Sequence, residues 1–155
     1  MLSNRRIQVA VIGSANPSEH GYQTAYDVGK LLAREGVVIL CGGLGGVMEA
    51  VSRGASDEGG LVVGIVPRSR EDANEWLSAV VSPGMGLARN YVLVNSADGV
   101  IAVEGHTGTL SELCFASQLG LPVAGLGTWR LPALNIHHHD DAQHAVSWLL
   151  EMVNA

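Results

Sequence analysis

The chain has 155 residues, of which 47% are hydrophobic, and a formal net charge of −6. This length predicts one domain over residues 1–155, because single domains usually contain roughly 100–200 residues. The acidic charge argues against DNA or RNA as the main partner, since nucleic-acid binding depends on basic patches that neutralise phosphates. No apolar run approaches the ~18–20 residues that cross a membrane, no secretory leader is evident, and the two cysteines form no CxxC motif. We therefore expect a cytoplasmic protein with no membrane partner.

Apolar runs alternate with amphipathic stretches along the whole chain. In chain order, this pattern predicts a strand at residues 7–12, a helix at 18–35, a strand at 37–40, a helix at 47–55, a strand at 61–66, a helical turn at 75–77, a short strand at 79–81, a helix at 87–97 buried on most sides, a strand at 99–103, a helix at 109–119, a strand at 123–126, an irregular connection at 128–135 and a closing helix at 141–153. Apolar strands separated by helices predict an α/β fold with a doubly wound, mostly parallel, Rossmann-like sheet. Ligands of such sheets bind beyond the carboxyl ends of the strands.

Three glycine-containing turns follow predicted strands, at residues 13–17, 41–46 and 104–109. The second and third each lead directly into a helix. A helix N-terminus presents unpaired N–H groups and the positive end of a dipole, and glycines allow an anion to come close to them. Two such turns in one sheet predict a phosphate-binding site. The alternative is that the glycines only permit close packing of strands and helices.

Standard nucleotide motifs do not fit these turns. The P-loop ends in Gly-Lys-Ser/Thr, whereas the only lysine, Lys30, lies in the middle of a predicted helix. The dinucleotide fingerprint should follow the first strand, but the residues after Gly13 do not match it, and no acidic residue ends the third strand. Hydride-transfer chemistry is therefore disfavoured.

Two charged residues near the turns have alternative interpretations. Thr109 and Glu112 match a capping box, in which the glutamate only satisfies a backbone N–H group. Arg89 lies in an otherwise apolar segment, where a cation needs a partner. That partner is either a structural carboxylate or the phosphate of a ligand.

With these residues in view, the chain resembles the Rossmann-fold family often labelled "lysine decarboxylase-like". This family includes the LONELY GUY phosphoribohydrolases and the molybdenum cofactor carrier proteins, and the carriers are closer in size and pattern. The resemblance covers residues 7–150 and rests on residues 42–51, residues 104–112 and Arg89. It implies catalytic roles for Arg89 and Glu112, with Glu112 stabilising the oxocarbenium-like ribosyl centre or positioning water.

The resemblance also implies a set of ligand-binding residues, a possible cargo and an assembly. The residues expected to bind the phosphorylated ligand are Gly13, Ser14, Gly42, Gly43, Gly45, Gly46, Met48, Glu49, Arg89, Gly105, Thr107, Gly108 and Thr109. No cofactor is required, molybdenum cofactor is a possible cargo, and a homodimer or higher homo-oligomer is expected. A decarboxylase activity is rejected, because a pyridoxal-phosphate enzyme needs a Schiff-base lysine and Lys30 is misplaced for that role.

The sequence departs from the hydrolase motifs at three positions. Glu104 and His106 replace a proline and a glycine, and Asn90 replaces a lysine. Glu104 is expected to add negative charge beside the phosphate site. These changes favour a carrier or binding protein for a nucleoside monophosphate or molybdenum cofactor over a phosphoribohydrolase. An oligomer with a vestigial site is a further alternative.

A histidine tract precedes the closing helix. His137 and His139 share a face if the segment is extended, and histidine-rich tracts can bind metal. No other ligands point to this region. We expect a solvated loop without a metal, with Asp141 capping the closing helix.

Overall fold

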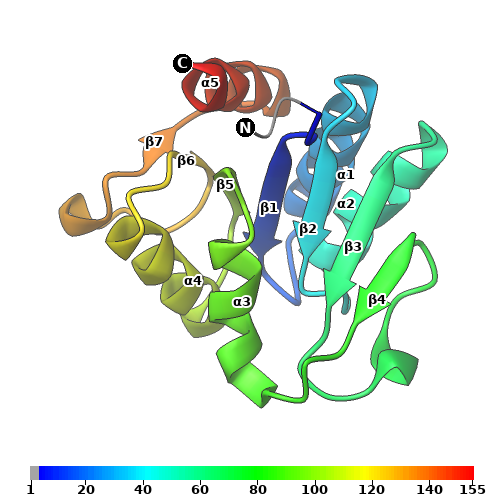
Figure 1. The fold of residues 1–155 in the computed structure, drawn as a ribbon. Helices are drawn as coiled ribbons and strands as arrows, with labels where there is room; N and C mark the ends of the chain where they lie inside the picture. The colour runs from blue at the N-terminus through cyan, green and yellow to red at the C-terminus, as the bar shows by residue number, and fades with distance from the viewer. Residues whose placement is uncertain (1–3) are drawn as a thin grey trace.

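The computed structural model describes residues 4–155, in which seven parallel strands form one sheet in the order β4-β3-β2-β1-β5-β6-β7 (Figure 1). The strands are β1 (Gln8–Gly13), β2 (Val38–Cys41), β3 (Leu61–Ile65), β4 (Ala79–Val81), β5 (Gly99–Val103), β6 (Val123–Leu126) and β7 (His137–His138). The helices are α1 (Glu19–Arg34), α2 (Val47–Asp57), α3 (Arg89–Asn95), α4 (Thr107–Gln118) and α5 (Ala142–Asn154), with short 3-10 helices at Arg70–Asp72, Gly86–Ala88 and Pro132–Leu134. The predicted Rossmann-like α/β fold is confirmed.

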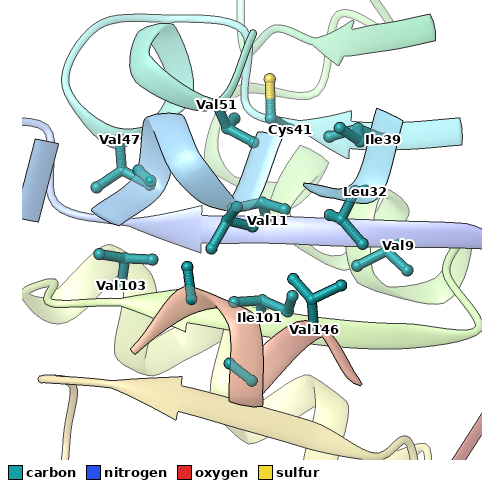
Figure 2. Close-up of a cluster of buried hydrophobic side chains, with 14 of the residues drawn as sticks. Val9, Val11, Leu32, Ile39, Cys41, Val47, Val51, Ile101, Val103 and Val146 are labelled. Atoms are coloured by element: carbon teal, nitrogen blue, oxygen red, sulfur yellow. The ribbon is translucent and has the colours of Figure 1, made fainter. Parts of the chain in front are cut away.

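The side chains of the central strands alternate between two hydrophobic cores. Val9 and Val11 of β1 pack with α1, α2 and α5, and Figure 2 shows them beside Leu32 and Val146. Ala10 and Ile12 of the same strand pack on the other face, in the cluster that contains residues of α3 and α4. Because both faces are covered, the strands read as continuous apolar runs in the sequence.

Strand β1 lies between β2 and β5, and the chain winds away from it in both directions. The order therefore reverses at β1, which makes the carboxyl end of this strand the topological switch point of the sheet. Gly13 ends β1 opposite Val103 of β5. A Cβ atom at Gly13 would lie 2.1 Å from the carbonyl oxygen of Val103, so this close approach requires glycine.

Side chains cap the starts of α1 and α5, and a glycine follows the end of α1. The Ser18 side chain accepts a hydrogen bond from the Gly21 N–H group at the start of α1, and Gly36 follows the helix with a φ of 70°. Asp141 caps α5 by accepting from the His144 N–H group, as predicted. Within residues 4–155, no helix combines the length and apolar character needed to cross a bilayer.

Several local predictions are wrong. The helical turn lies at Arg70–Asp72 rather than residues 75–77, because Ser69 caps it, while the Asn74 side chain accepts from the Trp76 N–H group in a turn. The buried helix over residues 87–97 is α-helical only from Arg89, and its first residue, Leu87, is 79% exposed.

The histidine tract is also not simply a solvated loop. His137–His138 forms β7, which pairs in parallel with β6 at the edge of the sheet. Two histidines carry no strand-like hydrophobic pattern, so pairing of their backbone with β6, rather than their side chains, makes this segment a strand.

Candidate functional site

A cavity of about 240 Å³ opens at the switch point of the sheet. It is lined by Ile12, Gly13, Ser14, Ala15, Gly42, Leu44, Met48, Leu87, Arg89, Asn90, His106, Gly108, Thr109 and Glu112. These residues come from the end of β1 and the turn after it, the turn after β2 and the start of α2, the 3-10 helix before α3 and the start of α3, and the first two turns of α4. The cavity therefore lies where a doubly wound sheet places its ligands.

Buried polar side chains gather around this cavity. Of the seven buried polar or charged residues within residues 4–155, five line it: Ser14, Arg89, Asn90, Thr109 and Glu112. Burial of polar groups costs free energy unless they find partners, so their concentration at one hollow makes this hollow the candidate functional site.

Arg89 is the buried cation of the site. It begins α3 and is 7% exposed, and a Cβ atom at Gly42 would lie 2.2 Å from its Nη1 atom. Glycine is thus required at position 42, in the turn after β2, because the Arg89 guanidinium packs directly on the backbone there. The buried Nε atom of Arg89 has no hydrogen-bond partner in the protein. No ion pair within 4.0 Å involves Arg89 among the described residues, so it has no structural salt bridge.

Glu112 is the buried carboxylate of the site. Burial raises its pKa to about 7, although the charge of Arg89 works in the opposite direction. Burial also lowers the pKa of Arg89, which the charge of Glu112 opposes. The two groups influence each other across the site without direct contact. A carboxyl group that titrates near neutral pH can accept or donate a proton there.

The capping-box interpretation of Glu112 is wrong. Helix α4 begins at Thr107, with His106 as the N-cap, so Thr109 lies within the first turn and Glu112 in the second. Glu112 therefore cannot serve the N-cap backbone, and its side chain lines the cavity instead.

The first turn of α4 presents its backbone to the cavity. Its first helical hydrogen bond runs from the Leu110 N–H group to the His106 carbonyl oxygen, at 2.9 Å. The N–H groups of Thr107, Gly108 and Thr109 precede that bond, as at any helix start. Nothing lies within 4 Å of where a Cβ atom of Gly108 would stand, so this glycine leaves open space.

Hydrogen bonds from three side chains hold this turn in place. The Asn90 amide donates to the Ser111 hydroxyl at 3.1 Å, and that hydroxyl donates to the Gly108 carbonyl oxygen at 2.6 Å. The Trp129 indole N–H group donates to the His106 carbonyl oxygen at 2.9 Å. The replacement of a lysine by Asn90 thus exchanges a cation for a hydrogen-bonding link between α3 and α4.

The structure brings together eight of the residues singled out from sequence: Gly13, Ser14, Gly42, Met48, Arg89, Gly108, Thr109 and Glu112. The others, which do not line the cavity, are Gly43, Gly45, Gly46, Glu49, Gly105 and Thr107. Gly46, for example, is the N-cap of α2 with a φ of 66°, and a Cβ atom there would lie 2.4 Å from the Ser14 carbonyl oxygen. Its role visible in the structure is to let two turns meet.

Sequence reasoning missed the apolar wall of the cavity. The missed residues are Ile12, Ala15, Leu44 and Leu87. Ile12, Ala15 and Leu44 are each next in sequence to a residue of the expected binding set. Their position in those turns is the sequence signal that could have identified them. Leu87 offered no such signal, because an apolar residue in an apolar segment looks like core.

The expectation that Glu104 places negative charge beside the phosphate site is wrong. Its carboxylate accepts hydrogen bonds from the Ser18 N–H group at 2.9 Å and the Ser18 hydroxyl at 2.5 Å. Glu104 lines a separate hollow with His20, Thr24 and residues of β6 and the segment after β7. Its charge is held at the start of α1 rather than at the cavity.

The side chains of the histidine tract pack against one another and against α5. His137 stacks on Trp148 with ring centroids 4.3 Å apart, and its Nδ1 atom lies 2.9 Å from Nε2 of His139. Within residues 4–155, no three His, Cys, Asp or Glu side chains are grouped as metal ligands.

The fold and the cavity define a Rossmann-like α/β protein with a buried arginine and glutamate at the switch point of its sheet. The chain belongs to the SLOG cluster4 family, whose model matches residues 6–152. Its homologues include LONELY GUY proteins, and its structural neighbours include molybdenum cofactor carriers, in agreement with the resemblance seen in the sequence.

Three relatives illustrate these similarities. The cytokinin riboside 5′-monophosphate phosphoribohydrolase LOG of Oryza sativa is 36% identical over 76% of this chain and 51% of the rice enzyme, so the chain spans about half the length of that relative. The molybdenum cofactor binding protein of Rippkaea orientalis superposes with a TM-score of 0.90 and 29% identity, over 97% of this chain and 99% of that one. The molybdenum cofactor carrier protein of Chlamydomonas reinhardtii superposes with a TM-score of 0.89 and 27% identity, over 97% and 100% of the two chains.

Proposed function

We propose that the cavity binds a phosphorylated, nucleotide-like small molecule, either a nucleoside monophosphate or molybdenum cofactor, and that the protein serves as its carrier. The observation that carries this proposal is the buried Arg89 guanidinium, whose Nε atom has no hydrogen-bond partner and which forms no ion pair, at a cavity that the first turn of α4 also lines. Burial of a cation without a protein partner is costly, and an anionic ligand would supply the missing partner.

The phosphate would bind between Arg89 and the start of α4. Charge-assisted hydrogen bonds from a guanidinium to phosphate are among the strongest in proteins. The N–H groups of the first turn of α4, together with the helix dipole, favour an anion at the same place. Gly108 leaves room for that approach, since nothing occupies the space next to its Cα atom.

The rest of the ligand would contact the apolar wall. Ile12, Leu44, Met48 and Leu87 provide surface for a flat heterocycle, and Leu87 is 79% exposed. A cavity of about 240 Å³ is slightly smaller than the ~300–1,000 Å³ typical of small-molecule sites. We infer that the phosphate and its neighbouring groups enter the cavity, while the ring system lies near its mouth.

The relatives support the same class of ligand. The structural neighbours are named as proteins that bind or carry molybdenum cofactor, and the rice relative as an enzyme that acts on a riboside 5′-monophosphate. Both kinds of molecule combine a phosphate with a nitrogen heterocycle. A resident cofactor is not part of the proposal; molybdenum cofactor would be cargo.

Calorimetric titration with AMP, GMP and molybdopterin tests the proposal. We expect one of them to bind the wild-type protein and to lose affinity in Arg89→Ala. Arg68→Ala, which removes an exposed arginine outside the cavity, is the matched control and should bind normally. Absence of binding by all three compounds would overturn the proposal and favour a vestigial site.

A second candidate function is phosphoribohydrolysis of a nucleoside 5′-monophosphate. Glu112 favours it, because a carboxyl group with a pKa of about 7 shares the cavity with Arg89. An ionised Glu112 would stabilise positive charge that develops at the sugar carbon during cleavage of the N-glycosidic bond. Chromatography for free adenine after incubation with AMP tests this activity. Turnover that is lost in Glu112→Gln would support hydrolysis, and no adenine from the wild type would exclude AMP as a substrate.

We also propose a cytoplasmic homo-oligomer without a nucleic-acid partner. Large apolar side chains stand exposed around α3 and at the end of α4, including Met85, Leu87, Tyr91 and Leu119. Such exposure is typical of surfaces that pair with another chain. Sedimentation equilibrium would give the assembly, and a strictly monomeric protein at micromolar concentration would contradict it.

A further inference from the structure

Glu104 joins two segments that reach the carboxyl edge of the sheet. It follows β5 directly, and its two carboxylate oxygens accept from the N–H group and the hydroxyl of Ser18, the N-cap of α1. The Ser18 hydroxyl oxygen in turn accepts from the Gly21 N–H group at 2.9 Å. A full carboxylate thus sits at the positive end of a 16-residue helix.

Gly21 leaves space for the Glu104 carboxylate, and hydrogen bonds hold the Glu104 backbone in place. A Cβ atom at Gly21 would lie 2.2 Å from Oε2 of Glu104 and 2.4 Å from its carboxyl carbon, so a helical residue without a side chain makes the space. Glu104 also adopts a φ of 54°, one of only two non-glycine residues in 4–155 with positive φ. Its N–H group donates to the Leu126 carbonyl oxygen, and its own carbonyl oxygen accepts from the Thr128 hydroxyl at 2.7 Å.

The hydrogen bonds between Glu104 and Ser18 lie next to the turn after β1, which forms one wall of the proposed cavity. Ser14 and Ala15 line the cavity and lie only a few residues before Ser18. The Ser14 N–H group donates to the Val103 carbonyl oxygen at 3.3 Å, and the Ser14 carbonyl oxygen accepts from the Val47 N–H group at 2.9 Å. The turn after β1 is therefore held at its beginning by β5 and α2, and at its end by Glu104.

We propose that Glu104 is a positioning residue of the ligand site, whose carboxylate acts as an internal anion at the N-terminus of α1. It fixes the turn that carries Ser14 and Ala15, and it occupies the place where α1 would otherwise attract an anionic ligand. The phosphate is thereby directed to the start of α4. The part of this inference that concerns phosphate binding rests on the proposed function. The contact of the Glu104 carboxylate with the start of α1 is a property of the ligand-free protein.

Substitution of Gly21 tests the role of the Glu104 carboxylate while the glutamate itself stays in the chain. In a helix, Gly→Ala normally stabilises, but in the wild type the new methyl group would displace the Glu104 carboxylate. We expect Gly21→Ala to lower the Tm of the wild type by about 2–4 °C and to raise that of Glu104→Ala by about 1–3 °C. Stabilisation of the wild type by Gly21→Ala would overturn the proposal.

Rescue by a small carboxylate gives a readout that general structural damage would not. Sodium formate should raise the Tm of Glu104→Ala more than that of the wild type or of Glu19→Gln, with sodium chloride as the ionic-strength control. Glu19 is the matched control, because it lies in the same helix turn with no side-chain link to β5. Equal responses of all three proteins to formate would contradict an anion site at α1.

Ligand affinity then separates this inference from the proposed function. We expect Glu104→Ala to bind inorganic phosphate or AMP about 3–10-fold more weakly, corresponding to about 0.6–1.4 kcal/mol, with recovery in formate. If the wild type binds none of inorganic phosphate, AMP, GMP and molybdopterin, the proposed function fails while the Gly21 and formate experiments still decide the role of Glu104. If the wild type binds and Glu104→Ala binds equally well, Glu104 does not position the site.

Discussion

The starts of α1 and α4 lie at the same edge of the sheet but are satisfied in different ways. At α1, Ser18 and the carboxylate of Glu104 occupy the helix end. At α4, the N-cap His106 provides no side-chain hydrogen bond, and the first turn lines the cavity beside Arg89. The sequence therefore provides one helix end with its own anion and leaves the other facing a buried cation without a partner.

This difference explains why Glu104 and Glu112, eight positions apart, have different environments. Glu104 is hydrogen-bonded by Ser18 and supports the start of α1. Glu112 is buried, has its pKa raised to about 7, and forms no ion pair with Arg89. One carboxylate stabilises the fold, whereas the other opposes folding once it ionises.

The largest expected effect concerns the stability contributed by these two glutamates. Unfolded Glu112 titrates near 4.5 and the folded residue near 7, so the folded state binds the proton more tightly and loses stability as pH rises between these values. Glu112→Gln should match the wild type at pH 4.5 and exceed its free energy of unfolding by about 3 kcal/mol at pH 8, because each pKa unit corresponds to about 1.4 kcal/mol. Urea unfolding across this pH range measures the difference.

The Glu104→Gln variant is the comparison for that series. It should be less stable than the wild type at pH 8, because it removes a charge that a helix end and two hydrogen-bond donors favour. Effects of the same sign in both variants would remove the distinction between the two carboxylates.

A second prediction concerns Arg89. Its removal should weaken binding of a phosphorylated ligand by about 100-fold, the loss expected for a charge-assisted contact worth about 3 kcal/mol. The free energy of unfolding of Arg89→Met should not fall, since the protein loses a buried cation without an ion-pair partner. Titration and urea unfolding of the same variant measure both effects. A large loss of stability together with unchanged affinity would assign Arg89 a structural role.

The smallest expected effect concerns Gly108. Alanine fits there sterically and improves helix propensity, so Gly108→Ala should leave stability unchanged or slightly raised. Its methyl group would narrow the cavity and lower ligand affinity about 3–10-fold, equivalent to about 1 kcal/mol. Ser117→Ala, at the exposed far end of α4, controls for helix propensity. Unchanged affinity in Gly108→Ala would show that the ligand does not approach this turn.

The sequence predicts the sheet and much of the site because both depend on local patterns. Strand β5 is apolar throughout and β1 is apolar after Gln8, and β1 ends in Gly13 where two backbones meet. Arg89 stood out as a cation in an apolar segment, and the structure places it at the cavity with Glu112.

Features that depend on long-range contacts escaped prediction. The direction of the Glu104 side chain follows from Ser18, 86 positions earlier in the chain. Strand β7 exists because β6 offers a free edge, and Leu87 lines the cavity from a 3-10 helix at Gly86–Ala88 that precedes α3. The predicted start of α4 is two residues late, because Thr109 and Glu112 match a capping box whereas the helix begins at Thr107.

Backbone amide chemical shifts of the isotopically labelled wild type during titration with AMP show where the ligand binds, with inorganic phosphate as the competing probe. If the phosphate binds beside Arg89, we expect the largest shifts at Gly42, Gly108 and Thr109, with small ones at Ser18 and Gly21. Large shifts at the start of α1, or none at the start of α4, would contradict this placement of the phosphate.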